Sequence, residues 1–169
     1  DLAQAKKLLA EAGFPDGFSF KFLVRSAKIY IDQAVVAKSQ VEKIGLKSEL
    51  DIRESGAFWA ARDGLSWDAM LYGAVSVEMS DPDIVFSRVI TGSSGNYGKY
   101  SNKKVDELFA KQSAAVDPAE RKKLALELQR ELIKDPVFIP SYWRVTTALL
   151  YPRVKSYNNI GSYAGHGME

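Results

Sequence analysis

Helical and extended patterns alternate along the first 74 residues, and this alternation constrains the fold more than any other feature of the sequence. Apolar residues recur at helical spacing in some segments and at every second position in others. The predicted elements are, in chain order, helix 2–12, strand 18–24, helix 29–44, strand 46–52, helix 57–62 and strand 67–74. Because strands separated by helices favour crossover connections and parallel pairing, this order predicts an α/β fold with a sheet covered by helices on both faces.

Three details of this half can be predicted more closely. Ala34 and Val35 belong to the apolar stripe of the helix 29–44, so we expect both to face the sheet. Gly45 follows that helix, where a left-handed residue can end the helical path. The strand 67–74 is largely apolar on both sides, which predicts a central, buried position.

Capping residues mark the helices of the second half. Asp81, Asn102 and Asp117 each precede a helical pattern, where a side-chain oxygen can accept hydrogen bonds from the free N–H groups of the first turn. The predicted elements are helix 83–90, a Gly/Ser/Tyr loop at 91–100, a helix capped by Asn102, a helix from Asp117 to the stop at 135–136, strands 137–142 and 145–150, and an irregular tail at 156–169.

The composition excludes several kinds of chemistry. The chain has no Cys, so a disulfide, a thiol nucleophile and a Cys-ligated zinc are all excluded. The single His, His166, rules out a His-rich metal site, and a Ser-His-Asp mechanism would depend on that residue near the end of the chain. A net charge of +2 is too small to indicate nucleic-acid binding. No apolar run reaches the length of about 18 residues that a membrane-spanning helix needs. We expect no metal, no cofactor and no catalysis.

A glycine-rich loop is the first candidate site. Residues 92–95, Gly-Ser-Ser-Gly, offer backbone N–H groups that could hold a phosphate. They lack the Lys-Ser/Thr ending of a P-loop, and no strand directly precedes them. A plain turn is therefore the better interpretation.

Acidic residues surround the third predicted strand, and close carboxylates can serve acid–base catalysis or bind a hard cation. Asp81 and Asp83 are better interpreted as a helix cap and a first-turn acid, which the helix dipole favours. Glu78 differs, because it follows the carboxyl end of a strand, where open α/β sheets bind ligands. We regard Glu78 as a candidate for holding a cationic group, with an ordinary solvated loop acid as the alternative. The acidic residues are Asp63, Asp68, Glu78, Asp81 and Asp83.

Aromatic side chains could line a ligand groove, because they offer flat apolar faces with a polar edge. For any single aromatic residue, including Trp59 and Trp67, core packing is the better interpretation. The exceptions are Tyr72, Tyr97 and Tyr100, which surround the same strand end and loop.

Five blocks of sequence, in the right order, resemble motifs of the family-5 extracellular solute-binding proteins, the dipeptide- and oligopeptide-binding components of ABC importers. The blocks are DLAQAKKLLAEAGFPDG at 1–17, WDAMLYG at 67–73, DPD at 81–83, NYGKYSNKKVDEL at 96–108, and a segment at 117–140 that begins DPAER and ends DPVFIP. Any one block is weak, but five in order make a specific match that spans nearly the whole chain.

The resemblance implies an α/β fold, a periplasmic-binding-protein-like lobe with a central, mostly parallel sheet flanked by helices. Family members are longer and have two lobes that close on a ligand. We therefore expect residues 1–155 to form most of the C-terminal ligand-binding lobe. We expect residues 156–169 to be an irregular tail that begins the return to the first lobe.

The resemblance also implies a ligand site. Peptide-binding members carry an acid four residues before the Pro of the DP motif, and it pairs with the ammonium of the peptide. Glu78 stands four residues before Pro82, whereas Val75 occupies the place of the family's Trp. Backbone groups at 74–76 would meet an extended peptide by strand addition. The candidate ligand-binding residues are Tyr72, Ala74, Val75, Ser76, Glu78 and Tyr97.

The implied function is that of the substrate-binding component of an ABC importer. It would capture a peptide or a similar small cationic solute between two lobes and deliver it to the permease subunits in the membrane. The implied partners are the solute, the permease and the first lobe of the same chain, without nucleic acid. Two alternatives remain open: a solute-sensing domain of a DNA-binding transcription regulator, and a small α/β enzyme that uses the acidic residues.

The chain begins at Asp1, without Met and without a signal peptide. We expect it to be a piece of a longer protein, and the resemblance implies that the full-length form is periplasmic, or anchored to the membrane outside the cytoplasm.

Overall fold

A computed structural model of the chain describes residues 1–71, 81–139, 151 and 153–155. The chain divides into two compact units, Asp1–Ala74 and Val75–Glu169. Each unit has a hydrophobic core of its own.

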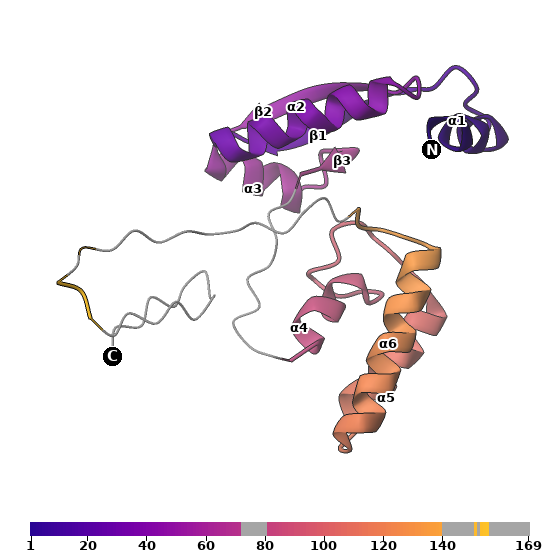
Figure 1. Ribbon diagram of the computed structural model, residues 1–169, viewed down its shortest axis with the longest axis vertical. Helices are drawn as coiled ribbons and strands as arrows, with labels where there is room; N and C mark the ends of the chain where they lie inside the picture. Colours follow the sequence, from indigo (N-terminus) through magenta and orange to yellow (C-terminus); the bar gives the residue numbers. More distant parts are fainter. Residues whose placement is uncertain (72–80, 140–150, 152, 156–169) are drawn as a thin grey trace. The chain divides into compact units, whose positions relative to one another are not determined.

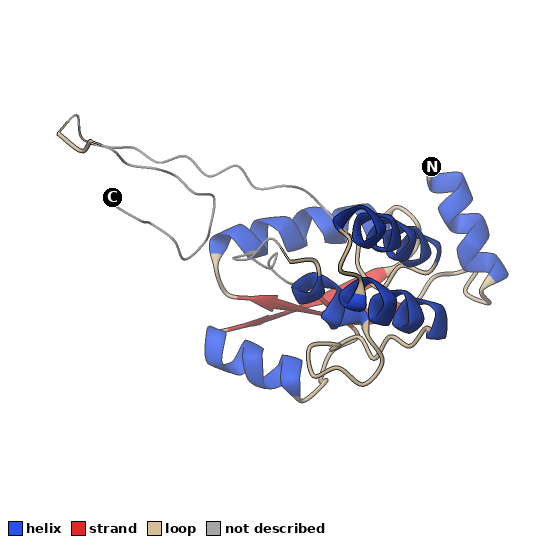
Figure 2. Ribbon diagram, turned by 90° about the horizontal axis from the view of Figure 1, so that it is seen from below, coloured by secondary structure: helices blue, strands red, loops and turns tan. Residues whose placement is uncertain are grey.

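A parallel sheet forms the centre of the first unit, drawn as red strands in Figure 2. Its strands are β1 (Ser19–Arg25), β2 (Lys47–Arg53) and β3 (Ala69–Met70), in the order β2-β1-β3. β1 pairs in parallel with β2 along the whole length of both strands, and it also pairs in parallel with β3. These pairings confirm the predicted parallel sheet. The carboxyl ends of the strands consequently meet at one edge.

The described part of this unit contains the helices α1 (Leu2–Glu11), α2 (Lys28–Glu42) and α3 (Ser55–Asp63). Asp1 caps α1, because its carboxylate accepts the Ala3 N–H at 2.9 Å. Helices α2 and α3 each pack on β1 and β2 (Figure 1). The helix-strand alternation of the sequence therefore produces the predicted layers of helix and sheet.

The core of the first unit lies between the sheet and α3. Leu23 of β1 is fully buried and packs with Phe58 and Ala61 of α3. Trp67 and Met70 add partly buried surface to the same cluster. Removing such side chains from water supplies most of the stability of a fold, so α3 is firmly held on this face of the sheet.

One predicted inward residue of α2 faces outward. Ala34 is fully buried, as expected, whereas Val35 is 53% exposed. A helix turns by about 100° per residue, so the neighbour of a buried position points away from the sheet. The prediction that Val35 faces the sheet is therefore wrong. Gly45 has φ +95°, which confirms the left-handed conformation expected after this helix.

The third strand is shorter than predicted within the described residues. Only Ala69–Met70 is extended and paired, and β1 rather than β3 occupies the middle of the described sheet. At the start of β3, the carboxylate of Asp68 accepts the Lys21 N–H at 2.7 Å. The Asp68 side chain thus accepts the hydrogen bond that the Lys21 N–H would otherwise donate to the backbone of a longer β3.

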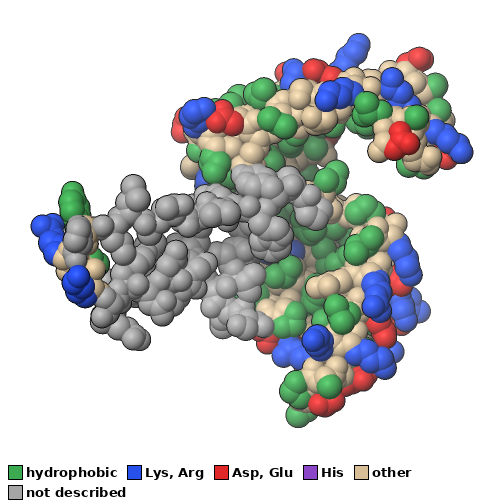
Figure 3. Space-filling view, viewed as in Figure 1, with side chains coloured by type: hydrophobic (Ala, Val, Ile, Leu, Met, Phe, Trp, Pro, Cys, Tyr) green, Lys and Arg blue, Asp and Glu red, His purple; other side chains and the backbone are tan. Residues whose placement is uncertain are grey.

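The second unit is helical where the structure describes it. It contains α4 (Asp83–Phe86), a 3₁₀ helix η1 (Ser87–Val89), α5 (Lys103–Ala114) and α6 (Pro118–Lys134). Helices α4 and η1 together cover the helix predicted at 83–90. Helices α5 and α6 pack side by side (Figure 1), and charged side chains of both signs are interspersed over their surface (Figure 3).

Two predicted caps order this helical pair. The Asn102 side chain accepts the N–H groups of Lys104 and Val105, and the Asp117 carboxylate accepts those of Ala119 and Glu120. The caps align apolar residues of both helices toward one core. The buried residues of that core are Phe86, Val89, Val105, Leu108 and Leu128.

Several predicted segments lie outside the described residues. They include part of the third strand, most of the strands at 137–142 and 145–150, and the tail at 156–169. Residues 137–139 are described and are not extended strand. Among the helices that the structure describes, none combines the length and apolar character needed to cross a bilayer.

Candidate functional site

The predicted ligand-binding residues divide into two groups. Tyr72, residues 74–76 and Glu78 lie outside the described residues. Tyr97 is described and half-buried, and its N–H donates to the carbonyl of Gly95 at 3.1 Å. Tyr97 is thus the one predicted residue that can be placed in the fold, in the loop between η1 and α5.

The other tyrosine of that loop, Tyr100, packs against the core of the second unit. Its hydroxyl accepts the side-chain N–H of Asn102 at 3.1 Å. Burial raises the pKa of Tyr100 above its ordinary value. The residue therefore has a packing role, and the interpretation of Tyr100 as a ligand-groove residue finds no support in its contacts.

The glycine-rich loop at 92–95 is a turn, as preferred from the sequence. The Ser93 N–H donates to the Ile90 carbonyl at 3.1 Å, and the Asn96 N–H donates to the Ser93 carbonyl at 3.0 Å. The buried Asn96 side chain further ties the Ile90 and Tyr100 carbonyls together. Hydrogen bonds within the loop thus hold the turn that the sequence favours over a phosphate-binding site.

Two of the described acidic residues, Asp63 and Asp81, each interact with a residue nearby in the sequence. Asp63 pairs with Arg62 at 2.7 Å, and the Asp81 carboxylate accepts the N–H of Asp83 at 2.9 Å. The Asp81 carboxylate therefore orders the turn into α4, but the N-cap of that helix is Pro82, so the cap predicted at Asp81 lies one residue too early. Within the part of the chain that the structure describes, no three acidic or imidazole groups gather as a metal site would require.

A different group of residues gathers at the carboxyl end of the sheet, where ligands of α/β folds usually bind. β1 ends at Arg25 and β2 at Arg53, and the Ser26 N–H joins the two ends by donating to the Arg53 carbonyl at 2.7 Å. The Ser26 hydroxyl donates to the Glu54 carboxylate at 2.5 Å. Polar groups from two neighbouring strands are thus held at one edge.

Arg25 is the distinctive member of this group. Its guanidinium donates to the Tyr30 hydroxyl at 2.9 Å, and its Cζ lies 4.5 Å from the Tyr30 ring centroid and 5.7 Å from that of Trp59. Aromatic faces attract a cation without neutralising its charge. Across residues 1–71 and 81–139, no carboxylate lies within ion-pair distance of Arg25.

Arg53, at the end of the neighbouring strand, provides a contrast. Its guanidinium donates to both carboxylate oxygens of Asp51, with the shortest bond at 2.7 Å. The hydrogen bond from Arg53 holds the pKa of Asp51 below its ordinary value. Among the described residues, Arg53 thus has a carboxylate partner at its strand end, whereas Arg25 has aromatic partners and a hydroxyl.

Trp59 is fixed in place from α3. Its ring makes an edge contact with Phe58 at 4.9 Å between centroids, and Arg62 lies 4.6 Å from the ring centroid. The aromatic surface beside Arg25 is therefore packed against neighbouring side chains of α3.

This arrangement suits an anionic group of a ligand. A guanidinium presents parallel donors that match a carboxylate, and it remains charged at all physiological pH values. The Tyr30 hydroxyl accepts from Arg25, so its own proton remains available for a second bond to the same group.

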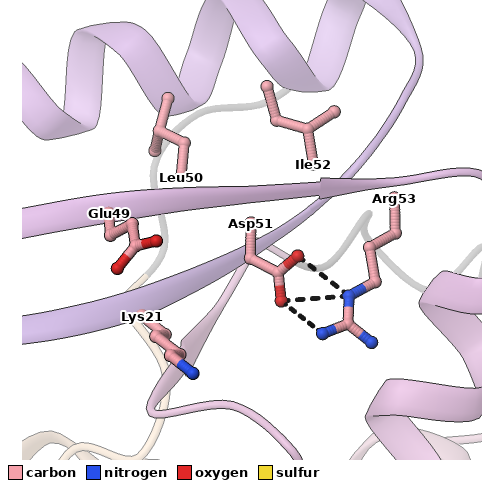
Figure 4. A pocket seen from close by; sticks show the side chains of 6 residues that line it. All are labelled: Lys21, Glu49, Leu50, Asp51, Ile52 and Arg53. Carbon is pink, nitrogen blue, oxygen red and sulfur yellow. Dashed lines mark hydrogen bonds and ion pairs between the residues drawn. The ribbon is translucent and has the colours of Figure 1, made fainter.

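A shallow depression of about 460 Å³ also lies beside β2 (Figure 4). Lys21, Glu49, Asp51 and Arg53 line it on one side of the strand, and Asp51 and Arg53 neutralise each other there. Specific ligand sites are mostly apolar with a few converging polar groups. The charged, open depression does not have that character.

Sequence reasoning missed Arg25 and Tyr30. Arg25 directly follows the predicted strand 18–24, and this place at the carboxyl end of a parallel strand is the signal that could have found it. Core packing is predicted for Trp59 and Trp67, and both rings pack against the core of the first unit. The Trp59 ring centroid also lies 5.7 Å from Arg25 Cζ, and the Trp67 indole N–H donates to the Arg62 carbonyl at 3.2 Å.

Comparisons with known proteins place these observations in a wider group. The sequence model of the bacterial extracellular solute-binding proteins, family 5 Middle, matches residues 1–97. The periplasmic oligopeptide-binding protein OppA of Salmonella typhimurium is 28% identical over 166 residues, which cover 91% of this chain and 29% of OppA. The glutathione-binding protein GsiB of Salmonella paratyphi A is 31% identical over 151 residues, which cover 83% of this chain and 29% of GsiB. The chain thus spans about three tenths of the length of these relatives.

Solved structures show the same fold. The periplasmic binding protein DppA of Helicobacter pylori, in complex with the peptide STSA, has a TM-score of 0.73 and 26% identity, covering 80% of this chain and 27% of DppA. The binding protein AgaA of A. tumefaciens R10, in complex with agropinic acid, has a TM-score of 0.73 and 27% identity, covering 79% of this chain and 28% of AgaA. These likenesses confirm the predicted α/β, periplasmic-binding-protein-like fold.

Proposed function

The chain belongs to family 5 of the bacterial extracellular solute-binding proteins, and on this premise we propose that it forms most of the C-terminal ligand-binding lobe of an ABC importer's receptor. The proposed lobe comprises residues 1–155, with 156–169 beginning the return to the first lobe. Family members are binding proteins rather than enzymes, and the relatives include periplasmic proteins. We place the full-length protein in the periplasm.

The proposed mechanism is capture between two lobes. A solute that contacts both lobes binds the closed form more tightly than the open form. It therefore shifts the equilibrium toward the closed form, by an amount set by the difference between the two affinities. Hinge closure around the solute then creates the surface that the permease subunits recognise.

The observation that carries this proposal is the Arg25 guanidinium at the carboxyl end of β1, on aromatic faces and without a carboxylate among the described residues. A group placed there can bind the anionic end of a solute. Independently of Arg25, the family resemblance supports Glu78 as the proposed partner of a ligand ammonium group, with Tyr72, residues 74–76 and Tyr97 as further proposed contacts. A short peptide with free ends offers both an anionic and a cationic group, so it is the ligand class that we propose.

The names of the relatives support this class. H. pylori DppA was solved with a peptide, GsiB is named as glutathione-binding and OppA as oligopeptide-binding. AgaA was solved with agropinic acid, so a likeness to this fold does not by itself restrict the solute to peptides.

The test uses the full-length protein and a randomised tripeptide mixture, prepared with free and with amidated C-termini. We expect saturable binding of the free mixture and weaker binding of the amidated mixture. Equilibrium dialysis with mass spectrometry measures the binding of both. Absence of binding to the free mixture would exclude short peptides. Equal binding of both mixtures would exclude a role for Arg25 in holding a terminal carboxylate.

A further inference from the structure

The carboxyl edge of the sheet carries two arginines in register. Arg25 of β1 pairs directly with Arg53 of β2 in the parallel ladder. Neighbouring strands lie about 4.8 Å apart, and residues in register point to the same face of the sheet. The two side chains therefore start close together, at the edge where we propose that a ligand binds.

The two guanidinium groups are held by different partners. Arg25 lies against the rings of Tyr30 and Trp59 and donates to the Tyr30 hydroxyl. Arg53 instead contacts an acid of its own strand, with Nε 2.8 Å from Asp51 Oδ1 and Nη2 2.7 Å from Asp51 Oδ2 (Figure 4). This contact uses both oxygens of the carboxylate, so it fixes the orientation of the Arg53 guanidinium as well as its position.

Asp51 is well placed to hold Arg53 in this way. It stands two residues before Arg53 on β2, so both side chains lie on one face of the strand. Glu49 is four residues from Arg53 along the strand, a separation of about 13 Å. The Glu54 carboxylate accepts the hydroxyl of Ser26. Among the described residues, the side-chain hydrogen bonds of Arg53 all go to Asp51.

This contact determines how much positive charge the edge offers to a ligand. Two guanidinium groups that start in register can bind two anionic groups of one solute, because each presents parallel donors that match a carboxylate. With Asp51 in place, the charge of Arg53 is balanced by an acid of the protein itself. Of the two arginines, Arg25 then remains for the solute.

We infer that Asp51 is a specificity-determining residue of the proposed site. By holding Arg53, it makes the edge select solutes that end in one carboxylate over solutes that end in two. The inference rests on the proposed function, because it needs Arg25 as the contact for the anionic end of the solute. A purely structural role of Asp51 would instead affect stability and leave the preference between the two kinds of solute unchanged.

Two matched peptide mixtures test this inference in the full-length protein. Both are randomised tripeptides with free C-termini, and the last residue is Asn in one mixture and Asp in the other. The two ends have nearly the same shape, but Asp adds a second carboxylate. Equilibrium dialysis gives the half-saturation concentration for each mixture, and thermal unfolding verifies that each variant is folded.

The variants separate the charge of Asp51 from its effect on Arg53. They are Asp51→Asn alone and Asp51→Asn combined with Arg53→Gln. Asp51→Asn combined with Arg130→Gln, on the exposed side of α6, is the matched control for loss of an arginine. Asp16→Asn, at an exposed turn, is the control for loss of one carboxylate. Asp51→Ser, which also removes the charge, replaces Asp51→Asn if that variant does not fold.

We expect the parent to bind the Asn-ended mixture more tightly than the Asp-ended mixture. Asp51→Asn releases the Arg53 guanidinium, so the ratio of the two half-saturation concentrations should shift about tenfold in favour of the Asp-ended mixture. The shift should disappear with Arg53→Gln and persist with Arg130→Gln.

Several results would overturn the inference and leave the proposed function standing. They are tighter binding of the Asp-ended mixture by the parent, an unchanged ratio in Asp51→Asn, a shift that persists with Arg53→Gln or is lost with Arg130→Gln, and an equal shift in Asp16→Asn. Failure of the parent to bind either mixture would overturn the proposed peptide ligand, and the inference with it.

Discussion

The Arg25 guanidinium donates to the hydroxyl of Tyr30 at 2.9 Å while lying 4.5 Å from the centroid of the same ring. Tyr30 stands in the first turn of α2, directly after the strand that ends at Arg25. The turn between β1 and α2 therefore brings a cation and its aromatic support together at the edge where the sheet can meet a ligand.

Replacing Arg25 tests the proposed anion contact. A charge-assisted hydrogen bond contributes about 1.5–3 kcal/mol, so Arg25→Gln should weaken binding of peptides with a free C-terminus by roughly 10- to 100-fold. Binding of C-amidated peptides should change much less. Calorimetry on the full-length protein measures both, with Arg130→Gln as the control. An equal loss for free and amidated peptides would mean that Arg25 acts through packing rather than charge.

Tyr30→Phe separates the hydroxyl from the ring. The variant keeps the aromatic face next to Arg25 and removes only the hydroxyl, which accepts from Arg25 and has a proton to donate. A neutral hydrogen bond contributes about 1 kcal/mol, so we expect a loss of affinity of roughly three- to tenfold. The loss should vanish in the Arg25→Gln background, because the two groups act on one ligand atom. A Tyr30→Phe protein that binds as tightly as the parent would exclude the hydroxyl from the site.

Asp83 links stability to pH. Its pKa in the folded chain lies below the ordinary 3.8, since the hydrogen bonds from its neighbours outweigh burial. A carboxyl group of this kind stabilises the fold above its unfolded pKa and loses that contribution as pH falls through the folded value. The Asp83→Asn chain should therefore be less stable at neutral pH, and its stability should fall less between about pH 5 and pH 2.

Urea unfolding at a series of pH values, followed by circular dichroism, measures this difference. Asp16→Asn, at an exposed turn, is the matched control for loss of one carboxylate. Parallel pH profiles for the parent and Asp83→Asn would show that Asp83 contributes nothing to acid unfolding.

Gly17 and Gly13 form a matched pair of glycines with positive φ, +74° and +89°. A side chain at either position has to adopt a left-handed conformation, which costs about 1 kcal/mol. At Gly17 a Cβ would also overlap the carbonyl of Gly45, whereas at Gly13 it would meet open space. Gly17→Ala should therefore destabilise the chain clearly more than Gly13→Ala in urea unfolding. Equal losses in the two variants would exclude a tight approach of Gly17 to Gly45.

Local patterns predicted most of the first unit. The alternating segments 18–24 and 46–52 form β1 and β2 within a residue or two. The alternation does not predict that Leu23 and Val24 are both fully buried, because α2 and α3 both pack on β1. The caps at Asn102 and Asp117 need only neighbouring backbone, so they could be identified without tertiary information. The prediction for Val35 is wrong because the apolar stripe of the helix 29–44 does not show which of its residues lies at the centre of the buried face.

The candidate site was harder to predict because its contacts are not local. Trp59 reaches Arg25 only because α3 docks on the sheet through Phe58 and Ala61. The same holds for Arg121, whose partners Asp81 and Asp83 stand some forty residues earlier in the chain. The sequence shows which residue types are present and how they are spaced, but the packing of the helices determines which of these residues contact one another.

The parallel pairing of β1 with β2 also sets an order of assembly. Parallel neighbours need a crossover, so β1 has no partner in β2 until the intervening segment, including α2, has folded back across the sheet. Closing the loop between β1 and β2 costs conformational entropy before the hydrogen bonds between the strands form. This pairing step is therefore slow compared with helix formation. During synthesis, a chain that ends before residue 47 carries Arg25 but lacks the neighbouring strand that holds it. The edge that we propose to bind an anion is consequently formed late in folding, after α3 has emerged and packed on the sheet.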